Sequence, residues 1–99
     1  MSDYLTHLRE HMRLIILRAL ADEPAYTHND AILTDIAKSF AVDRGRDFVR
    51  AEIRWLETIG AVTVRELASA LIVTATQRGV DHAQRRLVLD GVRRPSAEG

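Results

Sequence analysis

The sequence predicts one small domain that is mainly α-helical with a single small β-hairpin, and three observations support this fold class. Apolar residues recur at helical spacing in three stretches before residue 60. Between residues 61 and 76 the period changes to the alternation of β-strands. The length of 99 residues suits one hydrophobic core and leaves no room for a separate catalytic domain. We expect a single domain over residues 1–92 and a flexible C-terminal tail over residues 93–99.

The first expected helix runs from Asp3 to about Ala21, because apolar residues recur there every three or four positions and Pro24 lies just beyond. Leu14 and Leu17 fall on the side opposite the main apolar stripe. This second apolar side is either buried within the monomer or part of a homodimer interface. The sequence leaves both interpretations open, and the dimer would form through this helix and the last one.

A second, shorter helix is expected to begin at Asn29 or Asp30, after a turn-like connection over residues 25–29. It ends near Ser39 or Phe40. Its apolar residues are Ile32, Leu33, Ile36 and Ala37.

A third helix over residues 46–59 follows a tight connection at residues 41–45. Gly60 is expected to close it in the left-handed conformation that glycine tolerates. The predicted inward residues are Val49, Ile53 and Leu56, with Phe48 and Trp55 on a neighbouring flank of the core.

From Ala61 onward, alternating and β-branched residues predict a hairpin whose turn lies at residues 68–69. Thr76 is expected to cap a last helix over residues 77–90, with Gly91 as its stop. Helix, helix, short turn, helix, two-stranded hairpin and helix is the order of a winged helix-turn-helix.

Local motifs make this fold more specific. Residues 54–62 resemble the junction at which the recognition helix of many winged-helix regulators passes into the wing, and residues 76–79, Thr-Gln-Arg-Gly, resemble the start of the helix after the wing. Over nearly its full length, the chain resembles the small winged-helix proteins of Mu-like transposable bacteriophages and prophages, often labelled regulators of the arsenic-repressor type. The residues that carry this resemblance are Arg13, Leu14, Ile16, Leu17, Leu20, Arg46, Asp47, Val49, Trp55, Leu56, Thr76, Arg78, Gly79, Gly91, Val92, Arg94, Pro95 and Ser96. The resemblance implies a winged-helix fold, a phage origin and a role in transcription regulation.

If the domain binds double-stranded DNA as helix-turn-helix proteins do, its third helix enters the major groove with its N-terminal residues at the base edges. Arg46, Arg50 and Arg54 lie four residues apart and share one flank of that helix. A guanidinium there can contact guanine or clamp a phosphate. The candidate DNA-binding residues are Arg44, Arg46, Arg50, Arg54, Lys38 and Arg65.

Other features favour a second hypothesis. The 14 basic residues are balanced by 14 acidic ones, whereas a dedicated nucleic-acid binder is usually more basic. Asp47, Glu52 and Glu57 alternate with the arginines, and ion pairs on a solvated helix would use the same residues. The wing turn over residues 66–70 is short and carries an apolar Leu67. The alternative is therefore a protein-interaction module in phage development or assembly that binds a phage or host partner through its wing and first helix.

No enzymatic site or cofactor is expected. The chain has no cysteine, and it lacks the glycine-rich phosphate loops and the nucleophile motif of hydrolases. His7 and His11 fit a His-x-x-Glu-His pattern that would place two imidazoles on one helical face, but a catalytic zinc needs a third ligand and a shaped cleft. We expect neither to be a metal site, and we expect His28 and His82 to be surface residues.

The start of the sequence lacks a basic region, and arginines interrupt its longest apolar run. We therefore expect neither a signal peptide nor a membrane span, and a cytoplasmic location in a bacterial host cell.

Overall fold

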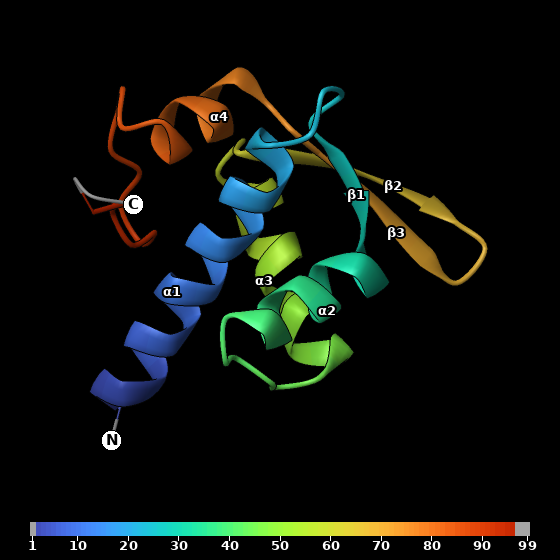
Figure 1. The fold of residues 1–99 in the computed structure, drawn as a ribbon, viewed down its shortest axis with the longest axis horizontal. Helices are drawn as coiled ribbons and strands as arrows, with labels where there is room; N and C mark the ends of the chain where they lie inside the picture. The colour runs from blue at the N-terminus through green and yellow to red at the C-terminus, as the bar shows by residue number, and fades with distance from the viewer. Residues whose placement is uncertain (1, 97–99) are drawn as a thin grey trace.

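A computed structural model describes residues 2–96 of the chain, which form four helices and a three-stranded antiparallel sheet (Figure 1). In chain order the elements are α1 (Ser2–Ala21), β1 (Thr27–Asn29), α2 (Asp30–Ser39), α3 (Arg46–Thr58), β2 (Val62–Leu67), β3 (Ala70–Ala75) and α4 (Gln77–Ala83). The positions of α1, α2, α3 and the hairpin agree with the sequence analysis. The arrangement is compatible with a small winged-helix-like fold.

The sheet contains a strand that the sequence analysis did not anticipate. Residues 27–29, expected within a turn-like connection, form β1, which pairs with β3 so that the strand order is β1-β3-β2. Three polar residues are too short a run to show a strand period, and β1 is defined by its pairing with β3. The hydroxyls of Thr27 and Thr74 hydrogen bond across this pair at 2.8 Å. The fold is therefore mixed α/β, with more sheet than the single hairpin that was predicted.

The core lies among the four helices and the sheet, and each of the four helices contributes buried residues to it. Val49, Ile53 and Leu56 of α3 are buried, as their helical spacing predicted. Leu14 is 5% exposed and Leu17 is fully buried, so the second apolar side of α1 is buried within the monomer. This burial favours the monomer interpretation for Leu17, whereas Leu14 also lines a surface groove that is described below.

The end of α4 is the largest departure from the predicted helices. It ends at Ala83 rather than near Asp90, and Arg85 takes a positive φ of 66°. His82, expected at the surface, is fully buried. Its Nδ1 accepts from Leu89 N–H at 3.0 Å, so its Nε2 carries the proton and donates to the carbonyl oxygen of Arg93 at 2.8 Å.

The segment after α4 is packed onto the domain. Leu89 and Val92 belong to the core, and Arg93 N–H donates to the carbonyl of Glu10 in α1 at 3.2 Å. The predicted tail boundary at residue 93 thus falls inside an anchored stretch, and residues 97–99 lie outside those described. His28 was also expected at the surface, but its side chain is only 15% exposed and lies 3.6 Å from a carboxylate oxygen of Glu23.

The hairpin of β2 and β3 projects beyond the helices in Figure 1, and α1 and α2 lie in front of α3 in that view. Gly60, which follows α3, has a φ of 77°, which confirms the predicted left-handed ending. No helix among residues 2–96 is long and apolar enough to cross a membrane.

Candidate nucleic-acid interface

A buried aspartate at the start of α2 organises the predicted arginine flank. Asn29 caps α2 by accepting a hydrogen bond from Ile32 N–H at 2.8 Å, as short polar residues do at helix N-termini. Asp30 is therefore the first residue of the helix. Its side chain points into the protein and is fully buried. A carboxylate in this position requires positive partners and hydrogen-bond donors around it.

Those partners come from α3 and from the hairpin. Arg46 donates to both carboxylate oxygens of Asp30, from Nε at 2.8 Å and from Nη2 at 3.2 Å. The Nε of Arg50 lies 2.7 Å from Oδ2, but it makes no hydrogen bond, so the contact is between charges only. Leu71 N–H, at the start of β3, donates to Oδ1 at 3.1 Å. One carboxylate thus joins α2, α3 and β3.

The same arginines also bind the turn of the hairpin. Arg50 Nη2 donates to the carbonyl of Ser69 at 2.7 Å, and Arg46 Nη2 reaches the same oxygen at 3.4 Å. One turn further along α3, Arg54 bridges Glu57 at 3.0 Å and Glu66 of β2 at 2.6 Å. We call Asp30, Arg46, Arg50 and Ser69 the Asp30 cluster. It holds the hairpin at a set position beside α3.

The partners of Asp30 keep it ionised. Burial raises the pKa of this carboxyl, but the hydrogen bonds from Arg46 and Leu71 and the charges of Arg46 and Arg50 outweigh burial. Together they lower the pKa of Asp30 from 3.8 to about 2. The cluster is therefore charged throughout the neutral range.

This shift predicts a loss of stability in acid. Because the folded-state pKa lies below the unfolded one, the contribution of Asp30 is complete above pH 4 and disappears as the pH falls from about 4 to about 2. The shift corresponds to about 2 kcal/mol in the free energy of unfolding. Urea unfolding at a series of pH values should show this decrease, and Asp30→Asn should lack it. Equal acid sensitivity in both proteins would assign the decrease to other carboxylates.

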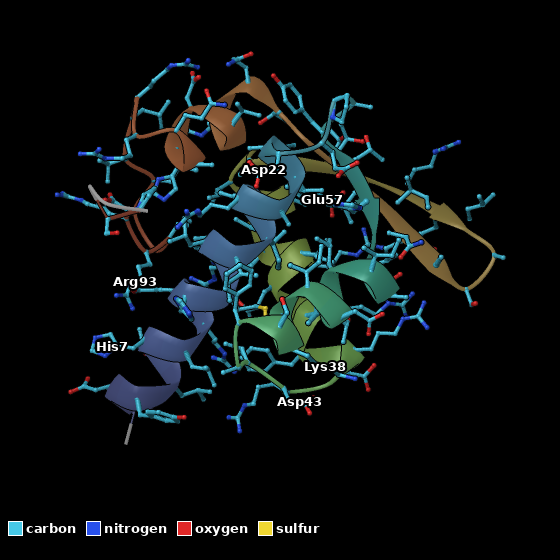
Figure 2. The ribbon with its side chains drawn as sticks, in the orientation of Figure 1. His7, Asp22, Lys38, Asp43, Glu57 and Arg93 are labelled. Carbon is cyan, nitrogen blue, oxygen red and sulfur yellow. The ribbon has the colours of Figure 1, made fainter. Side chains whose placement is uncertain are left out.

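The six predicted DNA-binding residues fall into two groups. Arg46, Arg50 and Arg54 lie together on the flank of α3 that faces the hairpin, as their spacing predicted. The other three are Lys38 near the end of α2, Arg44 before α3, and Arg65 on β2, and all three are exposed. Figure 2 labels Lys38 near the end of α2 and Asp43 in the connection that follows it. The structure therefore separates a fixed central group from cations at the margins.

Pairing does not remove the central arginines from the surface. Their side chains remain 43%, 34% and 42% exposed for Arg46, Arg50 and Arg54. Beside them, a shallow hollow of about 460 Å³ lies between α3 and the hairpin, lined by Asp47, Arg50, Ala51, Arg54, Glu66 and Leu71. A guanidinium has five N–H donors, so Arg46 can hold Asp30 and still present donors to a ligand.

The acidic residues that were expected to pair along α3 do so only in part. Glu57 pairs with Arg54, as the spacing indicated. Glu52 instead is 4% exposed and faces α1, where it binds Arg13 at 2.7 Å. The guanidinium of Arg13 also lies 3.6 Å from the ring centre of Trp55, which places Trp55 in the structural framework as predicted. Glu52 therefore does not neutralise the arginine flank.

The histidine motif of α1 shows no metal geometry. His7 is exposed, and burial together with the charge of Arg93 lowers the pKa of His11, which favours its neutral form. Among residues 2–96, no group of three or more histidine or acidic side chains is placed to hold a metal ion.

Comparison with known proteins identifies two relatives. The chain is 41% identical over 88 residues to the uncharacterized protein gp26 of Escherichia phage Mu, an alignment that covers 89% of this chain and 91% of gp26. It is 35% identical over 72 residues to an uncharacterized protein of Haemophilus influenzae, covering 72% of this chain and 70% of that protein. No family model and no solved structure matches the chain. The phage-related origin implied by the sequence is thus supported, and the chain belongs to the family of phage Mu gp26.

Proposed function

We propose that this protein is a DNA-binding winged-helix regulator of a phage or prophage, with α3 as its recognition helix. The observation that carries the proposal is the Asp30 cluster, which holds Arg46 and Arg50 on an exposed flank of α3 beside a projecting hairpin. In winged-helix proteins that bind DNA, such a helix enters the major groove and the hairpin follows the backbone.

Because the paired arginines are already held in place, they would lose less conformational entropy on binding DNA. An arginine side chain loses rotamer freedom when it contacts a phosphate or a base, and that loss weakens binding. In this domain Arg46 and Arg50 are already held by Asp30 and the Ser69 carbonyl. Lys38, Arg44 and Arg65 are exposed at the margins, where they would contact backbone phosphates without reading sequence.

A mobility-shift titration with sheared phage Mu DNA tests the proposal. We expect the affinity to fall steeply as salt rises, because each phosphate contact releases counterions. Arg44→Ala should reduce the slope of log affinity against log salt by about 0.9, the value for one phosphate contact. Arg50→Ala should weaken binding more strongly, because it also loosens the hairpin.

The matched control is Arg94→Ala, which removes an exposed arginine near the C-terminus. This variant should bind as the unmodified protein does. Absence of any shift at low salt would contradict the proposal, as would equal effects of Arg44→Ala and Arg94→Ala.

A second candidate function is favoured by one observation. Leu67, next to the hairpin turn, is 58% exposed, and an apolar tip suits a protein partner better than a phosphate backbone. Because Leu14 and Leu17 are buried, these two residues of the first helix expose little apolar surface to such a partner. Recovery of a stable complex from phage-infected cells, and its loss in Leu67→Glu, would favour this interaction module.

A further inference from the structure

A second surface lies between α1 and α2 and shares no residue with the Asp30 cluster. It is a groove of about 320 Å³. Leu14, Ile15 and Ala19 line it from α1, Ile36 lines it from α2, and Phe40 lines it from the position directly after α2. Its apolar lining extends the hydrophobic core to the surface.

An apolar ridge runs along the edge of this groove. Ile32, Ile36 and Phe40 recur every four residues, so their side chains neighbour one another along α2. Ile32 is 43% exposed and Phe40 is 62% exposed, although the inner face of the same helix is fully buried at Leu33 and Ala37. The groove and the ridge lie side by side, because Ile36 and Phe40 belong to both.

Charges of both signs lie at the same groove. Arg18, near the end of α1, and Asp22, just after that helix, both line it, and Figure 2 shows Asp22 at the C-terminal end of α1. Both side chains are exposed, and neither forms an ion pair within the described part of the chain. Glu23 also lines the groove, where its carboxylate lies 3.6 Å from His28. The surface thus offers a projecting aromatic ring, a hollow, a cation at Arg18 and an anion without an ion-pair partner at Asp22.

We propose that the α1–α2 groove is a homodimer interface, in which Phe40 of each copy lies in the groove of the other. A two-fold interface brings one patch against itself, so the patch must contain each feature together with its complement. This patch does so, because Phe40 complements the groove and Arg18 complements Asp22. A partner with different chemistry would not require all four features at once. The proposal is independent of DNA binding.

Sedimentation velocity without DNA tests the self-association. We expect a concentration-dependent shift from monomer to dimer between about 10 µM and about 1 mM. Phe40→Glu should raise the dissociation constant of the dimer roughly thirtyfold or more, as loss of a central aromatic contact does. Val88→Glu is the matched control, because Val88 is 54% exposed against 62% for Phe40 but lies in the segment after α4. Circular dichroism establishes that each variant is folded.

A charge exchange tests the orientation of the two copies. Arg18→Glu alone and Asp22→Arg alone should each weaken the dimer about tenfold, because like charges then face each other. In an equimolar mixture of the two variants, every facing pair is again opposite in charge, so dimerisation should return as a heterodimer.

Three results would overturn the proposal. The first is a single monomeric species over the whole concentration range, which would assign the groove to another occupant. The second is a dimer that tolerates Phe40→Glu, and the third is a charge-exchanged mixture that associates no better than either variant alone. Because DNA is absent from these measurements, their failure is separate from failure of the mobility-shift test.

Discussion

Replacing Asp30 with alanine should lower the free energy of unfolding by about 3 kcal/mol. It should also release the side chains of Arg46 and Arg50 from the positions in which Asp30 holds them. The substitution removes the shared partner of Arg46 and Arg50 and leaves Leu71 N–H buried without its acceptor. Loss of one partner from a buried ion pair costs about 3–5 kcal/mol. The lower end applies here, because the two guanidinium groups are 43% and 34% exposed and water recovers part of the loss.

Urea unfolding measures this change, and the mobility-shift titration measures its effect on DNA affinity. Asp35→Ala is the matched control, because Asp35 is an exposed acid on the same helix. It should change stability by no more than about 0.5 kcal/mol. If Asp30→Ala were as stable as Asp35→Ala, the Asp30 cluster would not hold the hairpin against α3.

Gly79→Ala should destabilise the protein by about 3 kcal/mol or prevent folding, although alanine favours helices over glycine. A Cβ at Gly79 would fall on the carbonyl oxygen of Ala61 and lie 3.0 Å from Cδ2 of Leu17. The Ala61 carbonyl cannot move aside freely, because it accepts a hydrogen bond from Thr76 N–H at 3.0 Å. This contact explains the glycine at residue 79 of the Thr-Gln-Arg-Gly motif: it lets α4 pack closely against α1 and against the residue that precedes β2.

Gly60→Ala provides the comparison. Gly60 has a φ of 77°, and a Cβ there would meet nothing closer than Cδ of Arg78 at 3.9 Å, so the cost of alanine is that of a left-handed backbone alone, about 1–2 kcal/mol. Thermal unfolding of the two variants should therefore separate a clash from a backbone preference. The assignment would be wrong if Gly79→Ala were the more stable of the two.

Local pattern was sufficient for α1, α2, α3 and the hairpin. The spacing of Val49, Ile53 and Leu56 identified the buried face of α3, because a helix with one apolar stripe has one way to face a core. Gly60 marked the end of that helix for a similarly local reason. By contrast, β1 and the end of α4 depend on contacts with distant residues, such as the pairing of Thr27 with Thr74.

The candidate site, like the fold, could be predicted only in part. Four-residue spacing placed Arg46, Arg50 and Arg54 on one flank of α3, and the structure agrees. The spacing indicated acidic partners on the same helix, where only Glu57 forms an ion pair with one of these arginines. The main partner, Asp30, reads in the sequence as an ordinary residue at a helix start. Its role depends on groups 16 and 41 residues away along the chain.

By itself, the sequence determined the positions of α1, α2, α3 and the β2–β3 hairpin, which face of α3 is buried, and where its arginines gather, because these follow from the repeat of the backbone. Only the tertiary structure decided that Leu17 and His82 are buried, that Asp30 holds the arginines, and that Phe40 stays exposed. Burial and charge pairing depend on which elements meet in space, and residue spacing within one element carries no information about that.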